Sequence, residues 1–351
     1  MAQHKRLQSL DILRGMTIML MIIVNNPGSW QYVYAPLLHS KWDGWTPTDL
    51  VFPFFLFIVG TAMWYSFKPT GQQLTAGLSK KIVKRSLLIF AIGLFLNAFP
   101  FIGFQVENLR IFGVLQRIAL VYCAASFLVL LVPIRVSVLV AAVVLFSYWA
   151  ILLLFGGAQP LSLEGNAVRQ LDLFLFGENH LYHGYGIPFD PEGLLSTLPA
   201  LVNVLLGYFA GKLIDETTSR EKVVVKLATS GLALFTLALL WNPFFPINKP
   251  IWSSSYVLLT CGLAAVLLAT LIWLVDIKGL KTWAQPFLVY GMNPLFIYVL
   301  AGIWANLLWL IKLPDGTSIQ QFIYAKLLLP WAGEYLASFL FALHLAQGKR
   351  I

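Results

Sequence analysis

Long apolar runs, separated by short polar or glycine-containing stretches, follow one another along the whole chain. An apolar run of roughly 20 residues is long enough to cross a bilayer as a helix. Five runs reach this length cleanly, at residues 50–67, 86–104, 136–155, 195–213 and 252–275. Less regular runs fill the gaps, at 10–30, 111–132, 227–241, 286–311 and 322–345. The runs are continuous and lack the alternation of membrane-barrel strands, so they predict an all-α, polytopic membrane helical bundle of about ten transmembrane helices.

The composition agrees with this pattern. Of the 351 residues, 59% are hydrophobic and 11% are charged, and the mean hydropathy is +0.78, far more apolar than a soluble domain of this length. The first run follows Lys5 and Arg6 but has no small-residue cleavage site, so we interpret it as a retained span. Cys123 and Cys261 fall within predicted spans and indicate buried structural thiols. The sequence contains no internal repeat and no linker, so residues 1–351 are predicted to form a single domain.

Lysine and arginine gather on one predicted face of the bundle. Ten spans place both termini on the same side, and loops rich in Lys and Arg face the cytoplasm. This face receives 17 of the 24 basic residues: Lys5, Arg6, Arg14, Lys68, Lys80, Lys81, Lys84, Arg85, Arg135, Lys212, Arg220, Lys222, Lys226, Lys278, Lys281, Lys349 and Arg350. We therefore predict that both termini are cytoplasmic. The same bias accounts for most of the net charge of +9, so no nucleic-acid partner is indicated.

Four polar segments fall on the opposite, external face, at residues 25–49, 97–110, 156–193 and 242–251. The longest of them contains acidic, histidine and aromatic side chains. Loops longer than about 15 residues without secondary structure are usually functional or disordered, and the aromatic content argues against disorder. We predict that the loop 156–193 is an external lid.

Asn25, His39 and Asp49 lie in the polar insert between the first two spans. Ionisable and amide groups packed against membrane spans are costly and often mark chemistry. Imidazole takes and returns a proton near neutral pH, and an amide with a carboxylate beside it matches the base-and-orienter arrangement of acyl transfer. Two structural alternatives stay open. A lone loop histidine is most often structural, and the Thr-Pro-Thr-Asp sequence that ends at Asp49 also resembles a helix cap.

Dense motifs follow in order along nearly the whole chain. The first part contains Arg6-Leu-Gln-Ser-Leu-Asp-Ile-Leu-Arg-Gly15, Val24-Asn25, His39-Ser-Lys-Trp-Asp-Gly44, and Asp49-Leu-Val-Phe-Pro-Phe-Phe55 with Gly60. The remainder contains Arg110-Ile-Phe-Gly-Val-Leu-Gln-Arg117, Asp190-Pro-Glu-Gly193 with Gly207 and Ala210-Gly211-Lys212, Asn248-Lys249 with Trp252-Ser253 and Ser255-Tyr256, Asp276-Ile-Lys-Gly279, and Gly291-Met-Asn293. Together these blocks resemble the heparan-alpha-glucosaminide N-acetyltransferase family and its bacterial NagX-like relatives.

This resemblance implies a transmembrane acetyltransferase in a bacterial inner membrane. Such an enzyme takes the acetyl group from cytoplasmic acetyl-CoA and transfers it to the amine of a glucosamine-type amino sugar on the periplasmic side. The functional histidine of the family corresponds to His39, with Asn25 and Asp49 at positions where the family also has Asn and Asp. The match at Asn25 is looser, because the insert is longer here and Asn26 is adjacent. We expect no counterpart of the luminal N-terminal domain of the animal enzyme, so the acceptor stays open.

Two chemical routes are open to His39 within that activity. It could deprotonate an amine bound together with the thioester, or it could accept the acetyl group before passing it on. We favour direct transfer, since a thioester is already activated and the amine needs only deprotonation. In either route Asn25 would orient the imidazole or stabilise the oxyanion, and Asp49 would hold the tautomer.

Arg110, Gln116 and Arg117 form a second candidate group, at the start of the run 111–132. An arginine within a span generally pairs with a carboxylate or a ligand, because an unpaired one costs several kcal/mol. The group therefore predicts either an internal ion pair that holds helices together or a contact to the donor or the acceptor.

Asn248, Lys249, Trp252, Ser253 and Ser255 form a third group, at the external start of the run 252–275. Their side chains offer hydrogen-bond donors to an oxyanion, a phosphate or sugar hydroxyls. Helix capping and an aromatic anchor at the membrane interface are the structural alternative.

Two weaker signals complete the candidates. The sequence Gly291-Met-Asn293-Pro294 interrupts a hydrophobic run and predicts a kinked or broken helix, with Asn293 as a candidate binding residue if that break lines a cavity. His180 and His183 have a spacing that metal ligands use, but no second well-spaced pair accompanies them, so we predict no metal.

A membrane transporter of an amino sugar or related solute is the rival function class, with the broken helix and Arg117 lining its path. Bundle topology alone does not separate the two classes. The external position of His39 favours the enzyme, because transporter sites tend to lie near the bilayer midplane. A homodimer is also compatible with the sequence, since a lipid-facing stripe and a dimer interface look alike.

Overall fold

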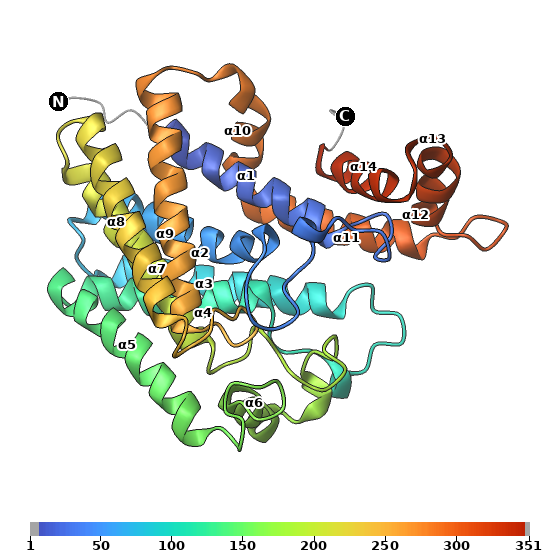
Figure 1. Cartoon of the computed structure of the whole chain (residues 1–351), viewed down its shortest axis with the longest axis horizontal. Helices are drawn as coiled ribbons and strands as arrows, with labels where there is room; N and C mark the ends of the chain where they lie inside the picture. Colours follow the sequence, from blue (N-terminus) through green and yellow to red (C-terminus); the bar gives the residue numbers. More distant parts are fainter. Residues whose placement is uncertain (1–6, 348–351) are drawn as a thin grey trace.

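The computed structural model describes residues 7–347, and every regular element in that range is a helix (Figure 1). The longer helices are α1 (Gln8–Asn25), α2 (Val51–Phe67), α3 (Ala76–Ala98), α4 (Val114–Leu131), α5 (Ile134–Phe155), α7 (Thr197–Glu216), α8 (Arg220–Trp241), α9 (Ser254–Leu271) and α11 (Pro294–Leu310). The shorter ones are α6 (Ala167–Phe176), α10 (Gln285–Met292), α12 (Ile319–Phe322), α13 (Leu329–Ala332) and α14 (Glu334–Gln347). The basic residues Lys5, Arg6, Lys349 and Arg350 lie outside the described residues.

Short turns of tighter or wider helix connect these elements. The 3-10 turns are η1 (Ala35–Leu37), η2 (Pro47–Leu50), η3 (Lys68–Thr70), η4 (Val106–Asn108), η5 (Glu178–His180) and η7 (Thr282–Ala284). Two π-helical segments, η6 (Ile272–Ile277) and η8 (Ile323–Leu328), continue α9 and α12. The all-α prediction is confirmed for the part of the chain that the structure describes.

Seven helices are long and apolar enough to cross a membrane. They are α1, α2 with its flanking turns, α4, α5, α7, α8, and α9 with η6. The bent pair α10 and α11 adds an eighth if the two count as one span. Residues 7–347 thus contain seven or eight candidate spans where the sequence predicted about ten, and the number ten is not confirmed.

The two remaining predicted runs differ from continuous spans for identifiable reasons. The run 86–104 belongs to α3, which begins ten residues earlier at Ala76, where Thr75 caps the N–H of Leu78, and whose first turns are basic. The run 322–345 is divided among α12, η8, α13 and α14. Pro330, which lacks a backbone N–H, and Gly333, at φ +71°, interrupt it.

The predicted break at Asn293 is confirmed. Helices α10 and α11 meet there at 82°, and Pro294 begins α11. Proline at the first helical position has no N–H to leave unpaired, so it starts the second helix where the first one ends. Asn293 itself is exposed at this corner.

Glycines bring the central helices into close contact. A Cβ on Gly60 of α2 would lie 1.9 Å from the carbonyl oxygen of Val204, and one on Gly207 of α7 would lie 1.9 Å from that of Phe57. Helix association in lipid depends on close packing rather than on a hydrophobic driving force, and small residues permit it. The α2–α7 pair is therefore a rigid centre to which the neighbouring external segments attach.

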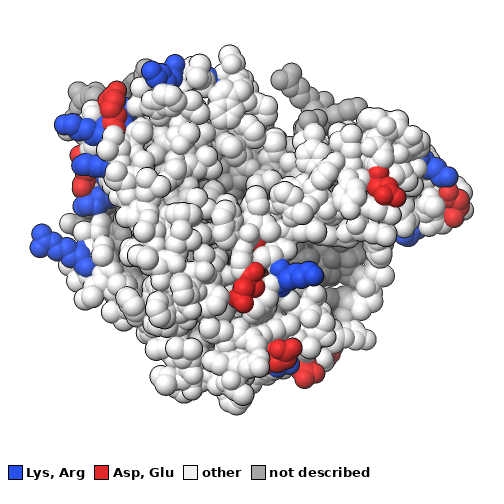
Figure 2. Space-filling model, in the orientation of Figure 1, with Lys and Arg blue, Asp and Glu red and all other residues white. Residues whose placement is uncertain are grey.

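The segments predicted to be external converge at the N-terminal end of α2. They are the loop between α1 and η2, the turn between α8 and α9, and the predicted lid, residues 156–193, which carries α6 (Figure 1). Figure 2 shows several Lys and Arg side chains at the upper left of the molecule, where α8 begins, with a broad uncharged surface next to them.

Candidate functional site

His39 and Asp49 form a close polar pair at the centre of the site. Nδ1 of His39 lies 2.6 Å from Oδ1 of Asp49. The histidine side chain is 48% exposed, whereas Asp49 is fully buried. A carboxylate only accepts hydrogen bonds, so this contact requires the imidazole proton on Nδ1 and leaves the lone pair on Nε2. His39 is thus held in the tautomer of a general base.

The other carboxylate oxygen of Asp49 fixes the turn in which it lies. Oδ2 accepts hydrogen bonds from the N–H of Ser40 at 3.1 Å, and from the N–H and hydroxyl of Thr46 at 2.9 and 3.1 Å. Thr46 and Asp49 form a capping box at the start of η2. Asp49 therefore fits both interpretations. Its Oδ2 caps the turn, and its Oδ1 contacts the imidazole of His39.

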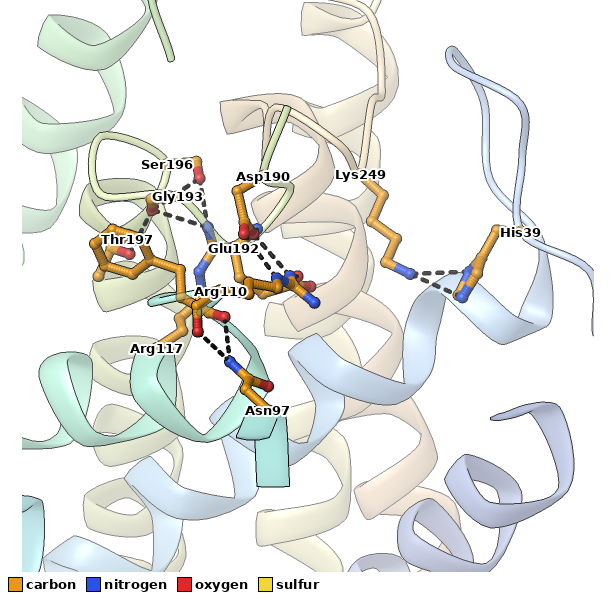
Figure 3. Close-up of polar contacts among 11 residues, drawn as sticks. His39, Asn97, Arg110, Arg117, Asp190, Glu192, Gly193, Ser196, Thr197 and Lys249 are labelled. Atoms are coloured by element: carbon orange, nitrogen blue, oxygen red, sulfur yellow. Dashed lines mark hydrogen bonds and ion pairs between the residues drawn. The ribbon is translucent and has the colours of Figure 1, made fainter. Parts of the chain in front are cut away.

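Lys249 lies against the imidazole of His39 and within reach of Asp49 (Figure 3). Its Nζ lies 2.9 Å from Nδ1 and 3.2 Å from Nε2 of the imidazole, and 3.5 Å from Oδ1 of Asp49. Because Nδ1 already donates to Asp49, Nε2 is the ring nitrogen that can accept from the amine. The lysine side chain is only 15% exposed, and this burial lowers the pKa of Lys249 below its ordinary value.

The turn that carries Lys249 is fixed to the His39 loop. The N–H of Gly44 donates to the carbonyl of Ile247 at 2.7 Å, and the amide of Asn248 donates to Asp43 at 3.2 Å. Asn248 is fully buried, and its side-chain oxygen accepts from the N–H of Ile251. The structure thus gives Asn248 a clamping role and brings Lys249 to His39 across 210 residues of sequence.

The residues that follow Lys249 anchor α9. Ser253 caps the helix by accepting from the N–H of Tyr256, and Ser255 donates to the carbonyl of Phe245 at 2.6 Å. Trp252 is buried at φ +52° and donates to Asn203 at 2.9 Å. The hydroxyl of Tyr256 donates to the carbonyl of Asp49, so the start of α9 also supports the turn that carries Asp49.

Arg110 fastens the lid to the bundle (Figure 3). Its guanidinium makes a bidentate pair with Asp190 at 2.8 Å and a further bond to Glu192 at 2.7 Å, and it lies over the ring of Tyr182. Burial alone would lower the pKa of Arg110, but the bonds and charges of the two carboxylates hold it above its ordinary value. The structure therefore places Arg110 in a charged latch, defined here as Arg110, Asp190 and Glu192.

Arg117 is fully buried beside this latch. Its Nη2 donates to the carbonyl of Gly193 at 3.2 Å and to the hydroxyl of Ser196, and its guanidinium lies 4.7 Å from the centre of the Trp252 ring. Nε and Nη1 have no hydrogen-bond partner within residues 7–347. Arg117 thus joins the end of the lid to the start of α9 without a direct ion pair.

Other candidate residues lie apart from His39. Asn25 lines a separate cavity of about 170 Å³ together with Asn306 and Gln320, at the end of α1. Gln116 is buried against Gly93 between α3 and α4. Of the histidine pair in the lid, His180 bonds through Nδ1 to the carbonyl of Leu109 at 2.7 Å. Among the described residues, no group of three His, Cys, Asp or Glu side chains gathers as metal ligands would.

A family comparison covers most of this site. The family of the heparan-alpha-glucosaminide N-acetyltransferase catalytic region matches residues 6–242. The chain belongs to this family. It is similar to human heparan-alpha-glucosaminide N-acetyltransferase, with 30% identity over 378 aligned positions that cover 90% of the chain and 56% of the relative. The mouse protein of the same name is 31% identical over 353 positions, covering 84% and 53%. The chain spans about half the length of these curated relatives.

The family match includes His39, Asp49 and the latch, but it ends before Lys249. Sequence reasoning had singled out Lys249 without connecting it to His39, and it had not assigned Asp190 or Glu192 as partners of Arg110. The one available signal for the latch was the Asp190-Pro-Glu-Gly193 block, which places two carboxylates two residues apart at the end of the loop.

Proposed function

We propose that the protein is a transmembrane acetyltransferase. It would move an acetyl group from cytoplasmic acetyl-CoA to the amine of a glucosamine-type amino sugar on the external side of a bacterial inner membrane. Membership of the family supports the reaction class. The observation that carries the assignment of residues is the 2.6 Å contact that orients His39 on a buried Asp49.

The chemistry requires removal of one proton from the acceptor. As the amine nitrogen attacks the thioester carbonyl, Nε2 of His39 takes the proton, and Asp49 stabilises the imidazolium that forms. The carbon–sulfur bond then breaks, and the thiolate recovers a proton to give CoA. The ammonium form of Lys249 would stabilise the oxyanion of the tetrahedral intermediate, because its Nζ lies 3.2 Å from Nε2, where the amine is deprotonated.

A cavity at the opposite end of α1 and α2 suits the donor. It has a volume of about 420 Å³, and its polar lining consists of Arg14, Arg220, Tyr65, Thr217 and Thr218 together with the carboxylates Asp11 and Asp215. Guanidinium and hydroxyl groups are suited to the phosphates of CoA. Helix α2 rises about 24 Å from Asp49 to Tyr65, at roughly 1.5 Å per residue. The acetyl group would therefore have to travel most of the bilayer thickness along α2.

This placement of the donor supports the proposed orientation. The donor cavity lies at the end of the molecule where we predict the cytoplasm, together with the basic side chains visible in Figure 2. The lid and its latch would then cover the external site. By excluding water there, the lid would protect the thioester from hydrolysis and strengthen the electrostatic contacts.

A transporter is the second candidate, because the 82° break between α10 and α11 is a feature of transport pathways. The test uses sealed inside-out vesicles loaded with glucosamine and supplied with radiolabelled acetyl-CoA outside. If the protein is an acetyltransferase, labelled N-acetylglucosamine is expected in the lumen. Efflux of glucosamine with no labelled product would overturn the proposal and support transport.

A further inference from the structure

We propose that Lys249 is an acetylation site of the protein itself. When no acceptor amine occupies the site, the acetyl group that reaches His39 passes to Nζ of Lys249. This inference rests on the proposed acetyl transfer at His39, and it adds an internal acceptor to that reaction.

The geometry makes Lys249 a competitor of the external amine. Its Nζ lies 3.2 Å from Nε2 of His39, the atom that takes the proton of the attacking amine in direct transfer and holds the acetyl group in the two-step route. Reacting atoms that start about 3–3.5 Å apart are close to attack geometry. An acetyl carbon that a bound acceptor can reach beside Nε2 is therefore also within reach of this lysine.

The surroundings of Lys249 favour a nucleophilic amine. The side chain is mostly buried, and burial increases the uncharged fraction by lowering the pKa of the ammonium. Asp49, at 3.5 Å, opposes this effect but offers a carboxylate beside the departing proton. The clamp of Asn248 on Asp43 holds the lysine backbone in place, and the contacts of Nζ with the imidazole and Asp49 keep the amine beside His39.

The step balances with acetyl-CoA as the only co-reactant. The lone pair of Nζ forms a bond to the acetyl carbonyl carbon, and the bond from that carbon to the CoA sulfur breaks. If the acetyl group first resides on His39, the bond that breaks is the one to Nε2. One proton leaves Nζ through His39 and reaches the thiolate, and the products are acetyl-lysine and the CoA thiol.

Acetylation would switch the site off. The amide carries no positive charge, so the stabilisation of the oxyanion is lost. The added acetyl group also fills the space beside Nε2 that the acceptor needs. A bound acceptor competes for the same acetyl group, so it protects Lys249 from acetylation.

The experiment incubates the purified full chain with acetyl-CoA and no acceptor, and maps acetyl-lysine by peptide mass spectrometry. Lys249 is expected to approach one acetyl group per chain, well ahead of the exposed Lys41, which lies two residues after His39. His39→Ala should slow this modification at least tenfold, and added glucosamine should reduce it. In Lys249→Arg no other lysine should take up the acetyl group.

Two results would overturn the inference. One is an unmodified Lys249 in protein that acetylates glucosamine, which leaves the proposed function intact. The other is equal modification of Lys41 and Lys249, which indicates reaction in solution. His39-dependent acetylation of Lys249 without any labelled amino sugar would uphold the inference and overturn the proposed acceptor. If neither lysine nor amino sugar is acetylated, both proposals fail.

Discussion

The carboxylate of Asp49 is fully buried, yet it reaches Nδ1 of the half-exposed His39 at 2.6 Å. Burial of a charge is costly unless hydrogen bonds satisfy it, and the Asp49 oxygens accept bonds from the Ser40 and Thr46 backbone. The turn therefore supports the carboxylate, and the carboxylate supports the imidazole.

Replacement of Asp49 separates its two roles. Asp49→Asn keeps a side chain that can cap η2, but it removes the charge that stabilises the imidazolium, so kcat should fall about 10²–10⁴-fold, the range for general acid–base catalysis. Thermal unfolding of this variant should lie closer to wild type than that of Asp49→Ala, because an amide oxygen can still accept from the N–H groups of Ser40 and Thr46. Asp49→Ala should lose both activity and stability. Wild-type kcat in Asp49→Asn contradicts the orienting role.

The latch should control the lid. Asp190→Ala leaves the Arg110 guanidinium with Glu192 as its partner, and disruption of a buried ion pair typically costs about 3–5 kcal/mol. Amide hydrogen exchange at residues 180–193 is expected to rise strongly, and the unfolding temperature to fall. Glu178→Gln, at an exposed position of the same lid, is the matched control and should change neither. Equal exchange in both variants would show that the latch does not hold the lid.

Asp172 gives the lid a pH dependence. Burial raises the pKa of this α6 carboxyl to about 7, from an ordinary value near 3.8. Between about pH 4 and pH 7 the Asp172 carboxyl keeps its proton in the folded state but has lost it in the unfolded state. Protonation of Asp172 therefore contributes its full stabilisation below about pH 4, and this stabilisation is lost as the pH rises to 7. Asp172→Asn should flatten that decline and be the more stable form at pH 8. Parallel curves of unfolding temperature against pH for the two proteins contradict this account.

The α2–α7 contact should not tolerate a methyl group. Gly60→Ala places a Cβ against the backbone of Val204, and such overpacking typically costs about 1–3 kcal/mol. Gly77→Ala is the control, because nothing lies within 4 Å of its Cβ position in α3. Thermal unfolding in the same detergent compares the two variants. A Gly60→Ala protein as stable as the control would show that the helices are less tightly packed.

The donor cavity is tested by Arg220→Gln. Loss of one phosphate-binding guanidinium should raise the KM for acetyl-CoA about tenfold and leave kcat and the KM for the acceptor nearly unchanged. Lys222→Gln, on an exposed position of the same helix outside the cavity, should have no such effect. Equal KM values for the two variants would remove the donor from this cavity.

The apolar runs predicted most of the helices. In lipid every backbone N–H and C=O group must form a hydrogen bond within the protein, and a helix forms these bonds within one segment. They failed where apolar composition alone does not make a helix. The run 322–345 contains Pro330 and Gly333, and these residues break it into short pieces. The break at Asn293 was predictable, since Pro294 follows it directly.

The site was predictable only in part. The chemistry of His39 and its separation of ten residues from Asp49 are local features, and a turn brings them together. The contact of Lys249 with His39 spans 210 residues and depends on how the α8–α9 turn packs on the loop between α1 and η2. No periodicity or spacing in a single sequence encodes such a contact. For the same reason the partners of Arg110 came from the structure.

The central claim is that His39 is the base for acetyl transfer across the membrane. The rate at which the acetylated sugar forms tests this claim most directly. The measurement is the initial rate of labelled N-acetylglucosamine formation in sealed inside-out vesicles, with His39→Ala and the exposed lid variant His183→Ala at matched protein levels. The account predicts a rate at least 10²-fold below wild type for His39→Ala, by the usual contribution of a general base, and a wild-type rate for His183→Ala. An undiminished rate in His39→Ala would contradict it.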